Sequence, residues 1–523
     1  MAEYLSPGIY MEEVNSGPRP IEGVGTAMAA FVGFAPGGPV NKPVLVTNWS
    51  QYVETFGVAE NGGKRNPHMK GAYLSHAVYG YFLNGGGRCY VTGLGSSKAM
   101  AQAPAPLQLP SKASKSVPSL SLLPKDAHTG DIEVEVKPPS GDQPADGTFT
   151  LRVRLGNVEE TYDNVSLGKG RGTKNVVETV NQTSKLVTVL EAQSTGTLAE
   201  RAPEVGTYTL KQSKLAKSTP TETLPAVQPK NFRGDASDRS GIAGLEVAED
   251  ATMLCCPDLM SAYEAGLIDR DGVKAVQTAM IGHCEQMGDR MAILDPLPGL
   301  SPQDVKTWRQ SDTNYDSKFA TLYYPWIRVA GPDGQPISIP PCGHMAGIYA
   351  RSDNERGVHK APANEVIRGA LETSTQVTKG EQDTLNPIGV NCIRSFSGQG
   401  IRVWGARTLS SDPAWRYVNV RRLFNYVEKS IERGTQWVVF EPNDADLWAR
   451  VRRDVGAFLT GVWRDGALFG LTAPEAFFVK CDEEVNPPDV RDRGQLIIEI
   501  GLAPVKPAEF VIFRLSQFAG GGA

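Results

Sequence analysis

Several short segments of the sequence contain residue types that perform catalysis or bind metals in other proteins. His283-Cys284-Glu285 matches the H-x-E half of the zinc deaminase signature, but no P-C-x-x-C half follows, because Pro341-Cys342 leads on to glycine and histidine. Residues 61–64 (NGGK) suggest a phosphate-binding loop, yet the first glycine of G-x-x-x-x-G-K would fall on Val58. The sequence contains neither G-x-S-x-G nor H-E-x-x-H, which argues against a nucleophile elbow and a zinc protease site.

The remaining reactive residues have ordinary structural explanations. Cys255 and Cys256 belong to an apolar segment, where small thiols are common core residues. The six histidines do not have the spacing of metal ligands. Arg351, Asp353 and Arg356 suggest a salt-bridged interdomain loop, because no nucleophile or base accompanies them. We therefore predict no catalytic residues, no metal site and no cofactor, and a protein that is not an enzyme.

Length and composition narrow the class of protein further. The chain has 523 residues, which predicts about three domains. Its formal net charge of −5 and pI of about 5.8 provide no basic field for nucleic acid. No apolar run approaches the roughly 18 residues that cross a bilayer, and the opening segment, with Glu3, lacks the apolar stretch of a secretory signal. The seven scattered cysteines are expected to be reduced thiols of a cytosolic protein.

The first part of the chain predicts an extended N-terminal segment followed by α/β structure. Residues 1–20 are interpreted as an N-terminal linking strand, and residues 21–100 as the first part of a central α/β domain. Short apolar runs predict buried strands at 29–34 and 89–91. Apolar residues at helical spacing predict helices at 48–56 and 68–83, the second ended by a run of glycines.

Composition changes at about residue 100. Residues 101–230 are rich in Ser, Thr, Lys, Pro and Val, and the segments 132–136 and 149–155 alternate apolar with polar residues. Such alternation is typical of antiparallel strands with one solvated face. We predict an inserted, surface-exposed, β-rich domain.

The rest of the chain returns to an α/β pattern and then becomes helical. Residues 231–375 are predicted to complete the central domain, with strands at 251–256, 290–294 and 321–329 and helices at 272–287 and 302–308. Residues 376–523 are predicted to form a C-terminal domain with helices at 417–433 and 443–463. Its predicted strands lie at 437–440, 476–480, 496–502 and 510–515.

These segments resemble the contractile tail sheath family of myophage tails, R-type pyocins and extracellular contractile injection systems. The resemblance begins with residues 5–13 (LSPGIYMEE) and leaves out only residues 100–230. The other matching segments are residues 241–246 (GIAGLE), 292–296 (AILDP), 322–327 (LYYPWI), 340–350 (PPCGHMAGIYA), 358–364 (VHKAPAN), 386–391 (NPIGVN), 403–408 (VWGART), 476–482 (AFFVKCD) and 507–511 (PAEFV).

The resemblance implies a mixed α/β, multidomain fold, with an inner domain made from both termini, a central α/β domain and a β-rich outer insertion. It also implies that the two terminal strands are lent to neighbouring subunits, an arrangement that builds an open helical polymer. The alternative for the last strand is an ordinary edge strand within the same subunit. The linking residues would be Tyr4, Ile9, Tyr10, Met11, Phe510, Val511, Ile512, Phe513, Arg514 and Leu515.

By the same resemblance, the helix at 443–463 is the one that faces an inner tube. We hypothesise that Arg450, Arg453 and Arg464, which lie off its apolar stripe, contact acidic groups of the tube; a solvated helix face is the alternative. Each such contact would contribute on the order of 1 kcal/mol or less.

The sequence thus predicts a structural sheath subunit that contracts from a metastable extended state to drive the inner tube through a target envelope. Its expected partners are further copies stacked in rings, the inner tube protein, and baseplate and terminator proteins, without nucleic acid or membrane insertion. Assembly is expected in the bacterial cytoplasm, within a phage tail or tail-like particle. The alternatives are a hydrolase built on the central domain and a baseplate or adhesin component.

Overall fold

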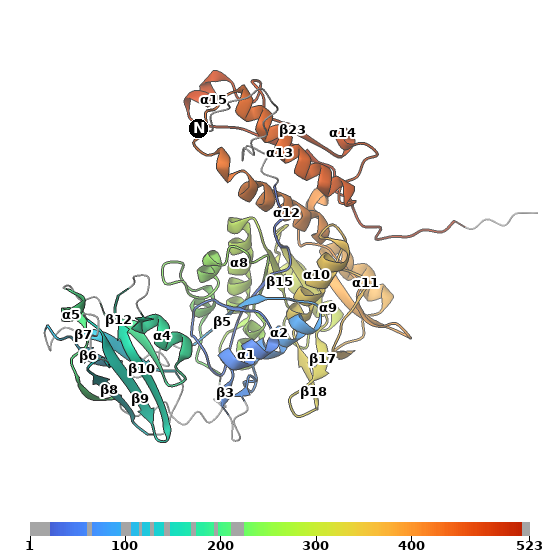
Figure 1. Cartoon of the computed structure of the whole chain (residues 1–523). Coiled ribbons are helices and arrows are strands. Elements are labelled where there is room, and N and C mark those ends of the chain that lie inside the picture. The colour runs from blue at the N-terminus through green and yellow to red at the C-terminus, as the bar shows by residue number, and fades with distance from the viewer. Residues whose placement is uncertain are drawn as a thin grey trace, which may run out of the picture. The chain divides into compact units, whose positions relative to one another are not determined.

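The computed structural model describes residues 21–59, 65–95, 106–113, 118–125, 130–140, 147–168, 174–192, 197–210 and 224–514. The chain forms two compact units, residues 96–222 and the remainder (Figure 1). The larger unit is mixed α/β, as the sequence predicts. The proposed N-terminal linking strand, with Tyr4, Ile9, Tyr10 and Met11, lies outside the described residues, and so does Leu515.

A nine-stranded sheet forms the centre of the larger unit, in the order β19-β22-β21-β16-β15-β14-β1-β5-β2. The six strands from β21 to β5 are parallel, and β2, β22 and β19 add antiparallel edges. The strands are β1 Ala29–Gly33, β2 Val44–Val46, β5 Cys89–Gly93, β14 Met253–Cys255, β15 Met291–Leu294, β16 Ala320–Tyr324, β19 Glu365–Val366, β21 Val390–Phe396 and β22 Gly400–Val403. All residues of β1, β14, β15 and β16 are buried, as expected for strands covered on both faces.

Helices cover both faces of this sheet, and each face has its own apolar core. Helices α6, α7, α8 and α9 contribute to one core, and α1, α2 and α10 to the other. The helices are α1 Trp49–Phe56, α2 Leu74–Leu83, α6 Pro229–Arg233, α7 Asp258–Glu264, α8 Arg270–Met287, α9 Pro302–Thr307, α10 Cys342–Arg356 and α11 Lys379–Leu385. Short 3₁₀ turns lie at Ala243–Val247, Asn386–Ile388 and Pro413–Trp415, and a π turn at Trp308–Thr313.

Two buried features join the N-terminal segment of this unit to the rest. The Asp258 carboxylate accepts hydrogen bonds from the backbone N–H groups of Phe34 (2.5 Å), Tyr73 and Leu74 (3.2 Å), so it satisfies free donors where α2 begins. Helices α2 and α10 also pack very closely. Gly343 of α10 lies so near the backbone of Ala77 on α2 that a Cβ at this position would overlap it.

One segment that we predicted as a single strand, residues 321–329, is two separate strands. The run at 321–329 forms two strands in different sheets, β16 and β17 (Ile327–Ala330). Pro325 lies between them and lacks the N–H that a continuous ladder would need. Strand β17 pairs with β18 (Pro336–Ile339) and β20 (Ala370–Thr373) in a separate three-stranded sheet. A short hairpin, β3 (Val58–Ala59) with β4 (Arg65–Asn66), lies near α1.

The C-terminal part has a separate apolar core built on two long helices. These are α12 (Val418–Gly434) and α13 (Ala445–Arg464), which Asp444 caps by accepting from Leu447 N–H at 2.9 Å. Shorter elements complete it: α14 Ala473–Ala476, β23 Phe477–Lys480, α15 Pro488–Asp492 and β24 Glu499–Leu502. The central sheet extends to β22, so its last strands lie beyond the limit that we predicted at residue 375.

Two further predicted strands are absent from the described chain. Residues 437–440 instead form a 3₁₀ turn at Gln436–Val438 and a loop in which Phe440 is fully exposed. Phe510–Arg514 is extended but pairs with no strand among the residues that the structure describes (Figure 1). Apolar β-branched runs favour extended structure in both places, but a strand forms only where a partner completes its hydrogen bonds.

Residues 96–222 form the smaller unit, a β-rich module with its own core. Its sheets have the orders β11-β10-β9-β8-β13 and β12-β7-β6. On the solvated side Arg152 of β9 pairs with Glu135 of β8 and Glu159 of β10. The elements are β6 Leu107–Pro110, β7 Pro118–Pro124, β8 Ile132–Lys137, β9 Phe149–Leu155, β10 Val158–Ser166, β11 Lys174–Asn175, α4 Val176–Thr183, β12 Val187–Glu191, α5 Leu198–Arg201 and β13 Gly206–Leu210.

Candidate assembly surfaces

The residues that imitate catalytic motifs lie in the core of the larger unit. His283 is buried on α8 against the Arg290 guanidinium, 3.2 Å from Nη1 to Nε2, and burial together with this cation lowers the pKa of His283 to about 4. Burial raises the pKa of the adjacent Cys284 thiol well above its ordinary value. Cys255 is likewise buried on β14. A neutral imidazole and a protonated thiol, both shielded from solvent, serve packing here.

The proposed ionic loop is wrong in its local structure, because Arg351, Asp353 and Arg356 lie on helix α10. Asp353 does form an interdomain ion pair, with Arg422 of α12. Among the described residues, no group of three or more His, Cys, Asp or Glu side chains is placed to hold a metal ion. No helix in the described ranges is long and apolar enough to span a bilayer.

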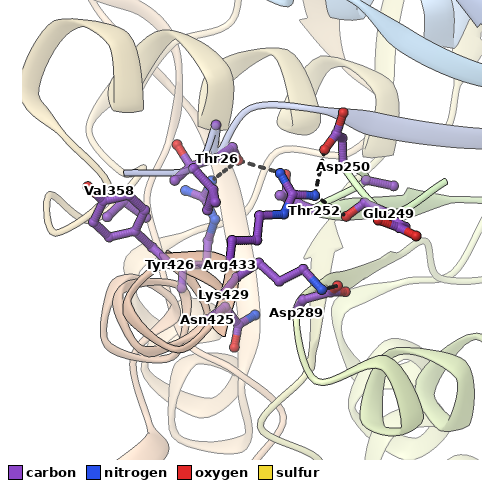
Figure 2. A pocket seen from close by; sticks show the side chains of 14 residues that line it. Thr26, Glu249, Asp250, Thr252, Asp289, Val358, Asn425, Tyr426, Lys429 and Arg433 are labelled. Atoms are coloured by element: carbon purple, nitrogen blue, oxygen red, sulfur yellow. Dashed lines mark hydrogen bonds and ion pairs between the residues drawn. The ribbon is translucent and has the colours of Figure 1, made fainter. Parts of the chain in front are cut away.

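The junction between the central sheet and α12 is polar (Figure 2). Arg433 of α12 donates to Asp250 at 2.8 Å, and Lys429 lies 3.5 Å from Asp289. The segment at 24–26 runs through the same place and lines a cavity of about 30 Å³. Ion pairs and hydrogen bonds to the backbone therefore hold this junction, together with the apolar contacts of Val358 and Val418.

One ion pair of this region is deeply buried. The side chains of Arg422 and Asp353 are each 3% exposed and form two hydrogen bonds, of 2.8 and 2.5 Å. The same guanidinium donates to the Thr26 carbonyl at 3.0 Å and lies over the Tyr349 ring at 4.7 Å. Because a buried cation loses its hydration, the Asp353 carboxylate supplies the charge that compensates Arg422 at the junction with α12.

The three arginines proposed to contact a tube lie on the solvent side of α13. Spacings of three and eleven residues place Arg450, Arg453 and Arg464 on one face, and all three are exposed. Two of them already have partners: Arg450 pairs with Glu441 at 3.2 Å and lies over Trp437, and Arg453 donates to Asp454 at 3.1 Å. The opposite face of α13 is apolar and buried in the core.

Strands β23 and β24 form a sheet of only two strands, and no third strand of the described chain pairs with it. The ring of Phe478, which is 56% exposed, covers Gly501 on the neighbouring strand. Phe469 and Leu471, in the loop after α13, are also exposed, and Phe469 N–H donates to the Ala503 carbonyl at 2.7 Å. A two-stranded sheet with exposed apolar side chains is a surface to which further strands can be added.

A cluster of polar side chains fixes the chain just before its last described residues. Glu509 accepts hydrogen bonds from Arg407 Nε (2.8 Å) and Nη2 (2.7 Å), Asn386 Nδ2 (2.7 Å) and the Tyr417 hydroxyl (2.9 Å). Burial opposes ionisation of Glu509, but these donors outweigh it and lower the pKa of the carboxyl group. We call these four residues the tail clamp. Sequence reasoning missed it; the only signal was that both charged members fall within segments that resemble the sheath family.

Directly after the clamp, the chain exposes four large apolar side chains in succession. Phe510, Val511, Ile512 and Phe513 are 70%, 70%, 79% and 84% exposed. We call residues 510–514 the C-terminal arm. An exposed apolar run of this kind marks an interaction site.

Comparison with known proteins identifies the family. The family model of the phage tail sheath protein central domain matches residues 247–409, and that of the phage tail sheath C-terminal domain matches residues 410–518. Together they take in more than half of the chain. The chain belongs to the contractile tail sheath family. The resemblance inferred from the sequence is confirmed, and the boundary between the two sheath domains falls between the tail clamp residues Arg407 and Tyr417.

Individual sheath proteins match parts or all of the chain. The tail sheath protein of Vibrio phage KVP40 is 30% identical over 177 residues, and that of Salmonella phage ViI is 29% identical over 244. These matches cover 33% and 44% of this chain, and the chain spans 26% and 37% of the length of those two relatives. The tail sheath protein of Burkholderia phage BcepMu is 24% identical, covering 98% of this chain and 96% of that protein.

A solved sheath structure matches over nearly the full length. The cryo-EM structure of the anti-feeding prophage helical sheath in the contracted state is 25% identical, with a TM-score of 0.58. It covers 98% of this chain and 100% of that chain, so the sheath fold includes the smaller unit as well as the matched domains.

Proposed function

We propose that this chain is the structural subunit of a contractile sheath, which polymerises into a helical sleeve around an inner tube. The observation that carries the proposal is the match to a helical sheath in the contracted state, at 25% identity over 98% of the chain. The sheath family is a structural one, and this chain is proposed to do mechanical work rather than catalysis. Contraction would be a change between two packings of the same subunits, from a metastable extended state to one of lower free energy.

We propose that subunits are joined by exchanged strands. The C-terminal arm would add to the two-stranded sheet β23-β24 of a neighbour, where backbone hydrogen bonds give affinity. Its apolar side chains alternate between two faces, so both faces of the added strand would be covered after assembly. The N-terminal linking strand, with Tyr4, Ile9, Tyr10 and Met11, is proposed to act in the same way. A head-to-tail contact of this kind generates an open helix.

We propose that the outer face of α13 lies against the inner tube. Ala457 and Gly461 lie between Arg453 and Arg464 on that face. Because both residues are small, the helix backbone could approach a partner closely between these two arginines. Because Arg450 and Arg453 already have acidic partners, each would exchange one ion pair for another, and the net attraction stays weak. Weak contacts suit a surface that is released along the whole tube.

Reversing the charge of these three arginines tests that contact. Arg450→Glu, Arg453→Glu and Arg464→Glu together should lower the amount of sheath that co-sediments with purified tube, most clearly at low salt. The matched control reverses three exposed cations that lie off α13, namely Arg233, Lys379 and Arg493. Normal co-sedimentation of the α13 variant would refute the contact.

The arrangement of the domains in the particle is also a proposal. The inner domain is proposed to contain both termini, and residues 101–230 to lie on the outer surface; the compactness of residues 96–222 and their separate core support a module that can face solvent. Baseplate and terminator proteins would bind the two ends of the sleeve. Assembly would take place in the bacterial cytoplasm, in a phage tail or tail-like particle.

Negative-stain electron microscopy tests the function as a whole. The purified chain should form striated hollow tubes, alone or with the inner tube protein, and variants lacking residues 1–16 or 510–523 should not. A full-length chain that stays monodisperse even with the tube protein would refute the proposal. Tubes that persist after both deletions would refute strand exchange while leaving the sheath function in place.

A further inference from the structure

The segment just before the C-terminal arm is attached to two different parts of the subunit. Upstream, the Val505 N–H donates to the Ala467 carbonyl at 3.2 Å, and its carbonyl accepts from Asn419 Nδ2 at 3.2 Å. Those partners belong to the C-terminal domain. At Glu509 the chain binds Arg407 and Asn386 of the central domain, together with Tyr417 at the start of the C-terminal domain. The chain therefore crosses onto the central domain before it becomes exposed.

Arg407 is itself fixed to the central sheet. Its backbone N–H donates to Asn391 Oδ1 at 2.7 Å, and its carbonyl accepts from Asn391 Nδ2 at 2.8 Å. Asn391 is fully buried on β21, and its amide also donates to Thr321 of the adjacent strand β16 at 2.9 Å. The backbone of Arg407 is thus fixed to the central sheet through Asn391, and its paired guanidinium nitrogens fit the two carboxylate oxygens of Glu509.

We propose that the tail clamp is the fixed root from which the C-terminal arm is presented to a second copy of this chain. This inference rests on the proposed function, since it requires an arm that links subunits. The clamp attaches the arm to the central sheet of the donor, whereas the sheet β23-β24 that would receive an arm belongs to the C-terminal domain. Each exchanged arm would therefore connect the central domain of one subunit to the C-terminal domain of the next.

The physical advantage of such a root is preorganisation. Without the clamp, the nearest upstream attachment is Val505, so residues 506–509 would become part of the loose arm. A longer loose arm has more conformations to lose on binding and a lower effective concentration at its receptor site. Glu509 immediately precedes the exposed residues. With the clamp in place, no flexible residues therefore lie between the donor subunit and the added strand.

The first part of the test measures the mobility of the arm in the unassembled chain. All seven native cysteines are buried, so a fluorophore placed on Ile512→Cys should react at that site alone. Glu509→Ala should lower the fluorescence anisotropy of this probe, and Glu509→Gln should do so less. The exposed Glu483→Gln is the matched control and should leave the anisotropy unchanged. The exchanged pair Arg407→Glu with Glu509→Arg should recover it in part, because the amide of Asn386 and the hydroxyl of Tyr417 can reverse their roles.

The second part measures assembly with the unlabelled variants. Loss of the clamp should raise the critical concentration for sheath formation about tenfold, the change that follows from losing one charge-assisted contact. Glu483→Gln should match the native chain, and the exchanged pair should lie between the two. A thermal melt of each variant identifies any that fail to fold, and Glu509→Gln then replaces Glu509→Ala.

The outcomes separate the root from the proposed function. If the native chain forms no sheath, both fail. If it forms sheath, and Glu509→Ala changes neither the anisotropy nor the critical concentration, the clamp is not the root of the arm, while the sheath function stands. A variant that only melts at a lower temperature would show that the clamp merely stabilises the fold, and would likewise overturn the inference.

Discussion

Removal of the Asp353 carboxylate should destabilise the larger unit strongly. Asp353→Ala removes the charged partner of the Arg422 side chain, which is 3% exposed in the native chain. Among the described residues, the Thr26 carbonyl at 3.0 Å and the Tyr349 ring at 4.7 Å then remain as its partners. Neither partner carries a charge that could replace the carboxylate. Breaking one side of a buried ion pair costs about 3–5 kcal/mol, and we expect a loss in that range. Asp353→Asn keeps the shape of the side chain and one oxygen that can accept a hydrogen bond from Arg422, so it should lower the unfolding free energy by less.

Denaturant unfolding below the assembly concentration measures this loss. All eight tryptophans lie outside residues 96–222, so tryptophan fluorescence follows the larger unit alone. The matched control is Glu372→Ala, which breaks an exposed ion pair with Arg328. The side chain of Arg328 is 42% exposed and that of Glu372 is 55% exposed. That change should cost less than about 1 kcal/mol. If Asp353→Ala also costs less than 1 kcal/mol, the description of the α10–α12 junction as a buried ionic contact is wrong.

Three further predictions concern packing, pH and domain independence. Gly343→Ala should lower the unfolding free energy by about 2 kcal/mol or more in the same assay, because its Cβ would overlap the rigid Ala77 backbone; an unchanged midpoint would contradict this packing. Burial and the nearby His76 lower the pKa of His344 from 6.5 to about 4, so the folded state binds fewer protons and stability should fall as pH drops from 6.5 towards 4. His344→Leu should flatten that part of the stability curve, and an unchanged slope would refute the assignment. Deletion of residues 105–222 should leave tryptophan-monitored stability and sheath formation intact, whereas loss of filaments would refute a peripheral module.

Local sequence patterns predicted many of the elements correctly. Short apolar runs became the buried strands β1, β5, β14 and β15, and the amphipathic helices at 417–433 and 443–463 are α12 and α13 within two residues. Both kinds of element depend on residue periodicity, which is visible along the chain. The predicted strand at 437–440 failed because an apolar run can end as a turn when no neighbouring strand is present to accept it.

The sequence by itself determined the family, the alternation of buried strands with covering helices, and the compositional break that separates the β-rich unit. These features depend on contiguous segments, whose residue types and periods are set locally. Only the tertiary structure decided that Arg422 meets Asp353, that Asp258 holds the start of α2, and that Glu509 is held by Arg407. Each of these pairs joins residues separated by 69 to 184 positions. Charge and residue type make such pairs possible, but the packing of the central sheet and its helices selects which of them form.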